Sequence, residues 1–243
     1  MLIVNADDLG LNQIATDNAL SCYRKGRVTS ATAMVFMEDS ERAARFAKES
    51  GIDVGLHINF IEGFTAISTP VRLRESQSRI RYFLKKSNYA LLVYNPFLTN
   101  DFRYVYQAQF DEFLRLFGRV PSHVDGHQHA HLASNMIIDC IVQRGSRIRR
   151  NFYFYPGEKS ILNRSYRYAA DWLLSKRYRM TDYFFALSQN MTNNRLERLI
   201  QLAKRSRVEL MAHPEVVDEF NFLMSDEYWQ AVSKVKLGSY LSF

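Results

Sequence analysis

The stretch HVDGHQHAH at positions 123–131 holds four of the six histidines of the chain. Imidazole is a common ligand of divalent metal ions, so this crowding indicates a metal site. Not every histidine in it need be a ligand. In an extended segment His127, His129 and His131 would share a face, whereas a turn would make them diverge. We expect at least one of them to orient a ligand through its other ring nitrogen.

Carboxylates and further histidines accompany other strand-like segments. They are Asp7 and Asp8 after LIVNA (2–6), His57 in DVGLHINF (53–60), Asp125 and His127 in PSHVDGH (121–127), and His213 in VELMAHP (208–214). In parallel α/β folds the carboxyl ends of the strands meet at one rim, where catalytic groups collect. We therefore expect these side chains to gather there, although they are far apart in the sequence.

This mixture of imidazole and carboxylate suits metal-assisted hydrolysis. Zinc, manganese and iron accept both ligand types, and magnesium accepts imidazole less readily. Two histidines and one aspartate would leave coordination positions open for water and substrate. A second carboxylate beside the ligand could take a proton from the bound water.

Each residue also has a purely structural interpretation. The Asp7-Asp8 pair could cap a helix or form a turn. His57, between Leu56 and Ile58, could be a hydrogen-bonded core histidine. A lone histidine before proline, such as His213, is more often structural than catalytic.

Strand-like and helix-like segments alternate along the chain. Strands are expected at 2–6, 28–36, 53–60, 121–127 and 208–214, and helices at 12–25, 40–50, 104–118, 134–145, 193–206 and 226–235. Such alternation predicts an α/β fold with a parallel sheet and outer helices, and the length favours a (β/α) TIM-like barrel over an open sheet. We expect one domain over residues 1–243, with a variable excursion, an active-face loop or lid, at about 61–103.

Composition bounds the class of protein. The chain has 243 residues, 47% hydrophobic and 23% charged, which is typical of a soluble globular protein. Cys22 and Cys140 are expected to be buried thiols rather than a disulfide. The first residues, MLIVNADDLG, resemble neither a signal peptide nor a membrane span, so we expect a cytoplasmic protein.

The formal net charge of +7 is concentrated in two basic stretches, 71–86 and 144–156. Such patches attract nucleic acid, anionic membrane surfaces or acidic ligands. No base-reading motif accompanies the charge, so we expect no nucleic-acid partner.

Four motifs in this order, IVNADDLG, GLHINF, PSHVDGHQHAH and MAHP, resemble the YdjC-like carbohydrate deacetylases, also called the chitooligosaccharide deacetylase (ChbG) family. Smaller matches extend the resemblance over essentially the whole chain. They are RVTSATAMV after the first helix, EGF at 62–64, FGRVPSHVD at 117–125 and LGSY at 237–240.

The resemblance implies a distorted (β/α) barrel that removes an N-acetyl group from an acetylated amino sugar or short oligosaccharide. It implies one divalent metal ion, Mg²⁺ or Zn²⁺, held by Asp8, His57 and His127. By the logic of the related polysaccharide deacetylases, Asp7 would be the general base and His213 the general acid. The family also often forms homodimers.

Other residues near these motifs are candidates for binding substrate or orienting ligands. They are Asp125, His129, His131 and Glu215. Glu215 departs from the family, which usually has a small residue after His-Pro, and Leu9 stands where the family usually has Phe. Aromatic side chains could stack on sugar rings, namely Phe60, Phe64, Tyr153 and Tyr155.

Two other functions compete with this hypothesis. The His-x-His in HQHAH is also typical of metal-dependent amidohydrolases and phosphoesterases, but those place it after the first strand, where this chain has Asp-Asp. A non-catalytic sugar- or nucleic-acid-binding barrel would instead use the basic patches.

Overall fold

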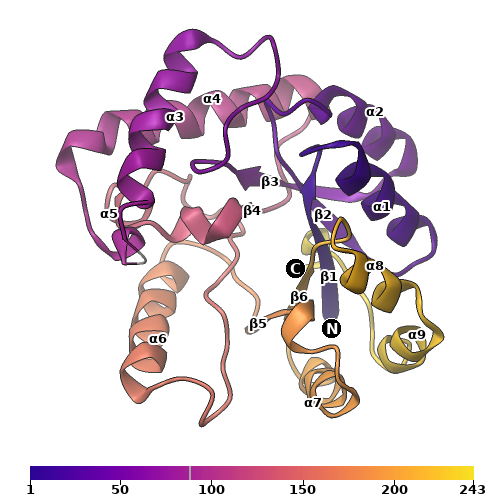
Figure 1. Cartoon of the computed structure of the whole chain (residues 1–243). Helices are drawn as coiled ribbons and strands as arrows, with labels where there is room; N and C mark the ends of the chain where they lie inside the picture. Colours follow the sequence, from indigo (N-terminus) through magenta and orange to yellow (C-terminus); the bar gives the residue numbers. More distant parts are fainter. Residues whose placement is uncertain (88) are drawn as a thin grey trace.

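The computed structural model describes residues 1–87 and 89–243, and its centre is one parallel sheet (Figure 1). The strands are β1 (Leu2–Leu9), β2 (Ser30–Ala33), β3 (Asp53–Ile58), β4 (Val124–Gly126), β5 (Tyr183–Ala186) and β6 (Val208–Ala212). Their order is β4-β3-β2-β1-β6-β5, and every neighbouring pair is parallel. Their carboxyl ends therefore share one edge.

Helices connect the strands and surround the curled sheet (Figure 1). They are α1 (Gln13–Arg24), α2 (Ser40–Ser50), α3 (Val71–Leu84), α4 (Thr99–Phe117), α5 (Ser134–Ile138), α6 (Ile161–Ser175), α7 (Asn193–Ala203), α8 (Val217–Met224) and α9 (Asp226–Val232). Strands covered on both sides are buried along their whole length, and every residue of β1 is buried. The predicted α/β fold with parallel strands and outer helices is confirmed.

The sheet forms a distorted half-barrel, and an irregular segment, residues 146–153, runs between its two edges. On one side the amide of Val124 donates to the carbonyl of Arg147 at 2.9 Å. On the other, the amide of Tyr153 donates to the carbonyl of Phe184 at 2.9 Å. The segment thus joins β4 to β5 without the regular pairing of a strand, and it brings its own side chains to the inside of the barrel.

Several elements differ from the sequence-based predictions. The region 61–103 contains a regular helix, α3, and most of it is not a loop. The helix expected at 134–145 is wrong beyond Ile138, because Cys140 has a left-handed φ of 51° that ends helical geometry. Cys22 is buried, whereas Cys140 is only half-buried. In the described ranges no helix combines the length and apolar character needed to cross a bilayer.

Candidate active site

Two adjacent aspartates reach the same site because β1 carries a bulge. The step from Ala6 to Leu9 takes three positions on β1 and only two on β2, where the partners are Ala31 and Ala33. Asp8 takes up the extra residue with a left-handed φ of 62°. Successive side chains of a regular strand point to opposite faces. The bulge breaks this alternation.

His57 is oriented by a residue on the neighbouring strand. His57 on β3 lies in register with Asp125 on β4, and its Nδ1 is 2.7 Å from Asp125 Oδ1. The imidazole therefore donates its Nδ1–H to the carboxylate and turns Nε2 towards Asp8, 3.2 Å from Asp8 Oδ1. A carboxylate behind a histidine in this way fixes the ring and its tautomer, as in many metal sites.

His127 approaches Asp8 from the loop after β4. Its Nδ1 is 2.9 Å from Asp8 Oδ1. The chain then turns sharply, because Gln128 and His129 have left-handed φ angles of 50° and 59°. The turn separates His127 from the histidines that follow it.

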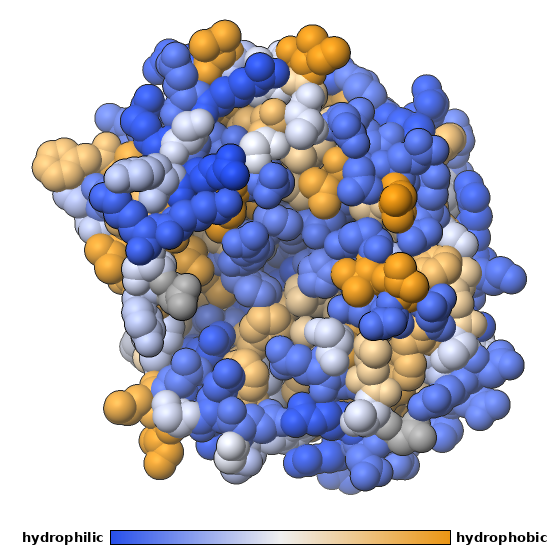
Figure 2. Space-filling model, viewed as in Figure 1, coloured by the Kyte–Doolittle hydropathy of each residue, from blue (hydrophilic) through white to orange (hydrophobic). Residues whose placement is uncertain are grey.

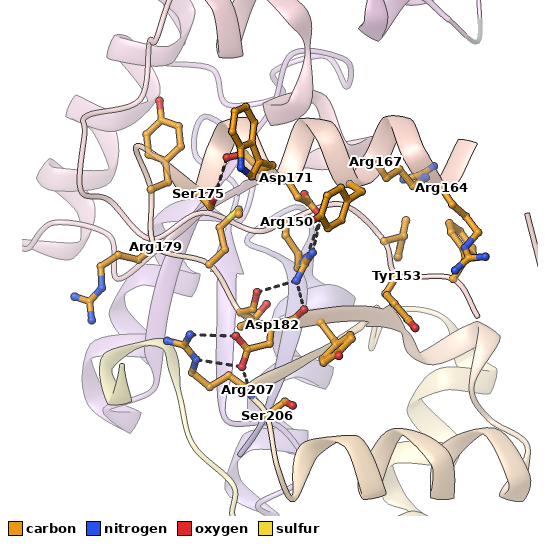
Figure 3. Close-up of a pocket in the computed structure, with 18 residues that line it drawn as sticks. Arg150, Tyr153, Arg164, Arg167, Asp171, Ser175, Arg179, Asp182, Ser206 and Arg207 are labelled. Carbon is orange, nitrogen blue, oxygen red and sulfur yellow. Dashed lines mark hydrogen bonds and ion pairs between the residues drawn. The ribbon is translucent and has the colours of Figure 1, made fainter. Parts of the chain in front are cut away.

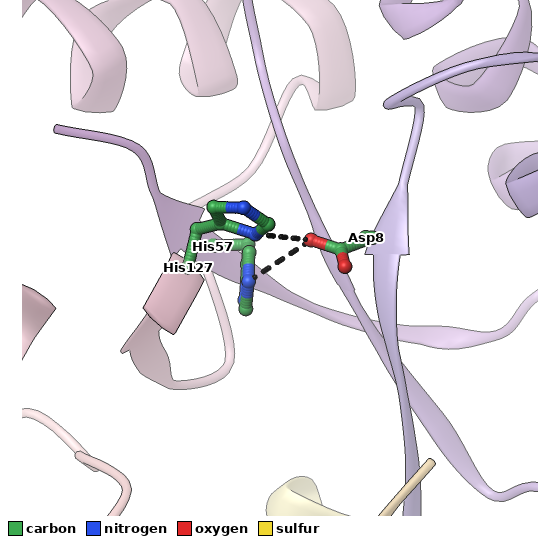
Figure 4. Close-up of side chains that lie close together, drawn as sticks. All are labelled: Asp8, His57 and His127. Atoms are coloured by element: carbon green, nitrogen blue, oxygen red, sulfur yellow. Dashed lines mark hydrogen bonds and ion pairs between the residues drawn. The ribbon is translucent and has the colours of Figure 1, made fainter. Parts of the chain in front are cut away.

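The ligand atoms of Asp8, His57 and His127 all lie within 4.8 Å of one another, and the three side chains point to a common centre (Figure 4). Ligand–metal distances of about 2.0–2.2 Å place neighbouring ligand atoms roughly 3 Å apart, so the spacing suits a small divalent ion. The donor set, one carboxylate oxygen and two imidazole nitrogens, also suits such an ion.

Electrostatics favour a cation at this point. Burial lowers the pKa of His57, but the carboxylates of Asp125 and Asp8 outweigh burial and raise it well above its usual value. Burial likewise raises the pKa of Asp8, and His57 and His127 outweigh it, so the net pKa of Asp8 is well below its usual value. The carboxylates thus attract positive charge to the site, and a metal ion would satisfy them without a proton on His57.

A second group of possible ligands, Asp7, His57 and Asp125, already has its cation. The fully buried guanidinium of Arg149 donates to both oxygens of Asp7, at 2.6 and 2.7 Å, and lies 2.7 Å from Asp125 Oδ2. Its Nε donates to Glu209 Oε1 at 2.7 Å. The Asp8 group is therefore the better candidate for a metal.

Arg149 also determines the state of Asp7. Burial raises the pKa of Asp7, but the Arg149 guanidinium outweighs burial and holds the net pKa well below its usual range. The amide of Asn5 adds a 2.8 Å hydrogen bond to Asp7 Oδ1. Asp7 is therefore ionised and fixed at neutral pH.

His213 lies on the open side of the cluster. Its Nε2 is 4.0 Å from Asp8 Oδ2 and its Nδ1 is 3.9 Å from Glu219 Oε1. The His213 side chain is 29% exposed, against 3% for Asp8. Burial lowers the pKa of His213, but Glu219, Asp7 and Asp8 outweigh it and raise the pKa to about 9. Figure 2 shows a hollow lined mainly by hydrophilic residues in the middle of the face where Figure 1 places β1 and β4.

The YdjC-like family model matches residues 1–234 of the chain. The chain belongs to the YdjC-like protein family.

Curated relatives of this YdjC-like protein include several chitooligosaccharide deacetylases. The enzyme of Enterobacter sp. (strain 638) is 29% identical over 224 residues, which cover 90% of this chain and 82% of the relative. That of Yersinia enterocolitica is 28% identical and covers 94% and 86%. The match to the Proteus mirabilis enzyme is 35% identical but covers 54% of this chain and only half of the relative.

Solved structures share the fold of the YdjC-like chain. A candidate cellobiose-phosphate cleavage protein from Enterococcus faecalis superposes with a TM-score of 0.71 at 19% identity, covering 99% of this chain and 97% of that one. The Xyl-CE4 domain of a multidomain xylanase from the hindgut metagenome of Trinervitermes trinervoides gives a TM-score of 0.50 at 8% identity, covering 99% and 87%. At these identities the likeness concerns the fold alone.

The remaining histidines of the 123–131 stretch surround the site without reaching its centre. His131 Nε2 donates to the carbonyl of Arg149 at 3.1 Å and so holds the chain that carries the guanidinium. His129 packs edge-on against Phe152, and burial, aided by the charge of Arg149, lowers its pKa to about 3. His123 stacks on Tyr240 with ring centroids 3.5 Å apart. These three imidazoles support the site from outside it.

Glu215 lies close enough to interact electrostatically with Asp8 and His213. Burial raises its pKa to about 7, and the charge of Asp8 adds to this effect. Within the described chain its buried Oε2 has no hydrogen-bond partner. An unpartnered carboxylate oxygen beside the cluster is available to a substrate.

The aromatic residues proposed to stack on sugars are mostly elsewhere. Phe60 is fully buried against Phe102, with ring centroids 4.9 Å apart, so that prediction is wrong. Tyr153 packs edge-on against Tyr183 on the far side of the barrel wall, and Tyr155 is buried. Phe64 is buried against Phe36. Core packing accounts for Phe60, Phe64 and Tyr155, whereas Tyr153 is half-buried and lines a cavity away from the site.

Sequence reasoning missed the network behind Asp7. Its members are Arg149, Glu209, Tyr240, Asn5 and Thr32. The hydroxyl of Tyr240 donates to Glu209, which explains why the closing LGSY belongs with the other motifs. The available signal was Glu209 itself, a carboxylate inside the apolar strand VELMA, because such a residue must have a buried partner.

Asp125→Asn is expected to weaken metal binding about 10- to 100-fold, because the NH2 group of asparagine would face a donor, either His57 Nδ1–H or the Arg149 guanidinium. A competition titration with a zinc-binding dye measures the affinity. Asp111→Asn, the same change on the exposed face of α4, serves as the control. Unchanged affinity in the Asp125 variant would mean that His57 needs no such support, or is no ligand.

Proposed function

We propose that this YdjC-like protein is a metal-dependent carbohydrate N-deacetylase that acts on an acetylated amino sugar or a short chitooligosaccharide. The convergence of Asp8, His57 and His127 within ligand distance of a common centre carries the proposal. The relatives named chitooligosaccharide deacetylases support the choice of substrate. We further propose that residues 1–243 act as one domain.

Asp8, His57 and His127 would hold the ion, Mg²⁺ or Zn²⁺. A divalent ion there supplies a Lewis acid for the amide carbonyl and a water of lowered pKa. The imidazole ligands favour zinc over magnesium. Asp125 keeps Nε2 of His57 free for this role by binding Nδ1.

Asp7 is proposed to take one proton from the attacking water while the oxygen of that water bonds to the acetyl carbon. Arg149 binds both carboxylate oxygens, so Asp7 is ionised and held in one orientation. The same contact weakens Asp7 as a base. We infer that Asp7 contributes mainly by position, which is worth more than basicity when the reacting atoms are already aligned.

His213 is proposed to protonate the leaving nitrogen. The C–N bond breaks, acetate leaves, and the sugar amine takes its proton from the imidazolium. A pKa raised to about 9 keeps His213 protonated at neutral pH. Glu215 is proposed to accept a hydrogen bond from substrate, and its position beside His213 supports that role.

The alkaline limb of the deacetylation rate is expected to depend on His213. His213 loses its proton as pH rises through its pKa of about 9, so activity should fall as the pH approaches and passes that value. Bound metal would draw part of the Asp8 charge away and move the limb to lower pH. His213→Gln should remove the limb and lower kcat about 10²–10⁴-fold.

Glu219→Gln gives a finer test of the same assignment. Removing the carboxylate beside His213 should lower its pKa and shift the alkaline limb to lower pH, while metal content stays unchanged. A pH–rate profile of each variant measures the shift. A limb at the same pH in the Glu219 variant would assign it to another group.

The function itself is tested by incubating the metal-loaded protein with diacetylchitobiose and N-acetylglucosamine and measuring acetate. Release of acetate that stops on chelation supports the proposal. Release of phosphate from phosphoesters without acetate would favour the phosphoesterase alternative. Salt-sensitive binding of sugar without turnover would favour the binding-barrel alternative.

A further inference from the structure

A cavity of about 870 Å³ lies between α6 and the segments 150–154 and 179–183 (Figure 3). None of Asp8, His57 and His127 lines it. The adjacent residues Arg149 and Arg150 lie on opposite sides of the wall between the barrel interior and this cavity. Arg149 binds Asp7 inside the barrel, and Arg150 lines the cavity on the other side. Binding pockets for small ligands typically have volumes of about 300–1,000 Å³, so the size suits one.

Positive charge lines this cavity beyond what its carboxylates neutralise. Arg150 pairs with Asp171 at 2.8 Å, and Arg207 pairs with Asp182 at 3.1 Å. Both carboxylates are thereby occupied. Arg164 and Arg167 also line the cavity, and neither has an ion-pair partner in the part of the chain described.

The two arginines are partly buried, whereas large apolar residues of the same helix are exposed. The outward side of α6 carries Ile161, which is 80% exposed, and Leu162, which is 83% exposed. Arg164 and Arg167 are half-buried on the cavity side, and Arg167 shares its side of the helix with the buried Ala170 and Leu174. Burial lowers the pKa of Arg167, so holding this side chain charged in the cavity costs free energy. An anionic ligand would offset that cost.

Aromatic rings and the hydroxyl group of Thr181 line the cavity. Tyr153 lies at the same end as Arg164 and Arg167 (Figure 3), and the guanidinium of Arg167 is 5.2 Å from the Phe154 ring. Trp172 lines the cavity from α6. Thr181 is only 2% exposed, and its Oγ1 has no hydrogen-bond partner in residues 1–87 and 89–243. Buried hydroxyls normally have partners, so this one points to a ligand.

We propose that the cavity binds a small ligand that carries a phosphate group on a ring. Arg164 and Arg167 hold the phosphate, because planar guanidiniums match phosphate oxygens in geometry and charge. The ring lies against Tyr153, Phe154 or Trp172, as planar and ring-shaped ligands do on aromatic faces. The ligand is a sugar phosphate or a nucleotide.

Trp172 makes the site observable, because the chain has only two tryptophans. In Trp229→Phe protein, Trp172 is the sole indole. Glucosamine 6-phosphate, AMP and inorganic phosphate are titrated in turn at constant ionic strength, with N-acetylglucosamine and chloride as references. We expect a saturable fluorescence change with the ring phosphates and none with the references. Tighter binding of glucosamine 6-phosphate assigns the site to sugars, and tighter binding of AMP assigns it to nucleotides.

Variants test which residues bind. The double variant Arg164→Gln/Arg167→Gln should bind ring phosphates at least tenfold more weakly. The control variant Arg45→Gln, on α2, should bind them with unchanged affinity. Thr181→Val, which keeps the shape of the side chain, should weaken the binding of ring phosphates a few-fold. Because this residue lies outside α6, the variant still tests the site if the double substitution unfolds that helix. No saturable change with any phosphate, or an unchanged affinity in both cavity variants, would overturn the proposal. Equal affinity for inorganic phosphate would overturn the part played by the ring.

Discussion

Asp8→Asn protein is expected to lose its bound metal and at least about 10³-fold in acetate release. Asp8 provides the carboxylate ligand, and both imidazoles approach the same oxygen, Oδ1. An amide oxygen is a much poorer ligand and leaves the site without its negative charge. Asparagine is the right replacement because it tolerates the left-handed backbone of Asp8, φ 62°, better than alanine does.

Two measurements decide this prediction. Metal content is determined by elemental analysis after dialysis, and acetate release is measured on diacetylchitobiose. Asp111→Asn on α4 controls for the change in charge, and circular dichroism checks the fold. Full metal occupancy in the Asp8 variant would remove the ligand assignment, whereas retained metal-free activity would remove the metal from the reaction.

The strand-end pattern predicted that Asp7, Asp8, His57, Asp125, His127 and His213 gather at one edge, and the resemblance to the family singled out three of them as metal ligands. Asp8, His57 and His127 each end or follow a strand, and parallel strands bring such ends to one edge whatever their distance in sequence. The fold class followed from the same alternation of strands and helices. These predictions depend only on local pattern and on the direction of the strands.

The bulge at Asp7 and Asp8 could not be predicted in this way. Whether one or both aspartates face the site depends on a register step between β1 and β2, which neither strand encodes alone. The turn at Gln128 and His129 is similar, because neither residue is glycine and both adopt positive φ. The chain packs tightly around this turn, since a Cβ at Gly126 would lie 2.8 Å from the backbone nitrogen of His131.

The role of Arg149 was not predicted because the sequence around it is typical of an exposed basic segment. It lies in RGSRIRR, where four arginines suggest a solvated basic surface. Only the path of residues 146–153 between β4 and β5 carries one of them inward, and that path has no regular strand pattern. The helix α6 was missed for a related reason, since it has apolar residues on both its buried and its exposed sides and its arginines face a cavity.

The charges inside the barrel explain why one arginine matters so much. Asp7, Asp125 and Glu209 are all buried, and Arg149 contacts each of them. Asp8 has no ion pair with that guanidinium among residues 1–87 and 89–243, where its side chain pairs with His57, His127 and His213. Arg149 therefore serves as the shared counter-ion of the inner carboxylates, and the outer one remains for the proposed metal ion.

Arg149→Met is expected to destabilise the fold by about 3–5 kcal/mol at neutral pH, the usual cost of leaving buried carboxylates without their partner. Urea unfolding with metal removed measures the free energy. Arg207→Met, which breaks the exposed pair with Asp182, should cost much less. An equal loss in the two variants would show that burial of the three carboxylates does not set the cost.

The pH dependence of that loss identifies its cause. In the unchanged protein Arg149 holds the pKa of Asp7 below its ordinary value of about 4, so the pair stabilises the fold above that pH and ceases to as pH falls through the depressed value. Without the guanidinium, burial is opposed only by weaker effects such as the charges of His57 and His213, so the pKa of Asp7 rises. Asp7 can then take up a proton in mild acid, so the deficit of Arg149→Met should be largest near pH 7–8 and shrink towards pH 5. A deficit that stays constant across this range would point to lost packing of a large side chain instead of lost charge.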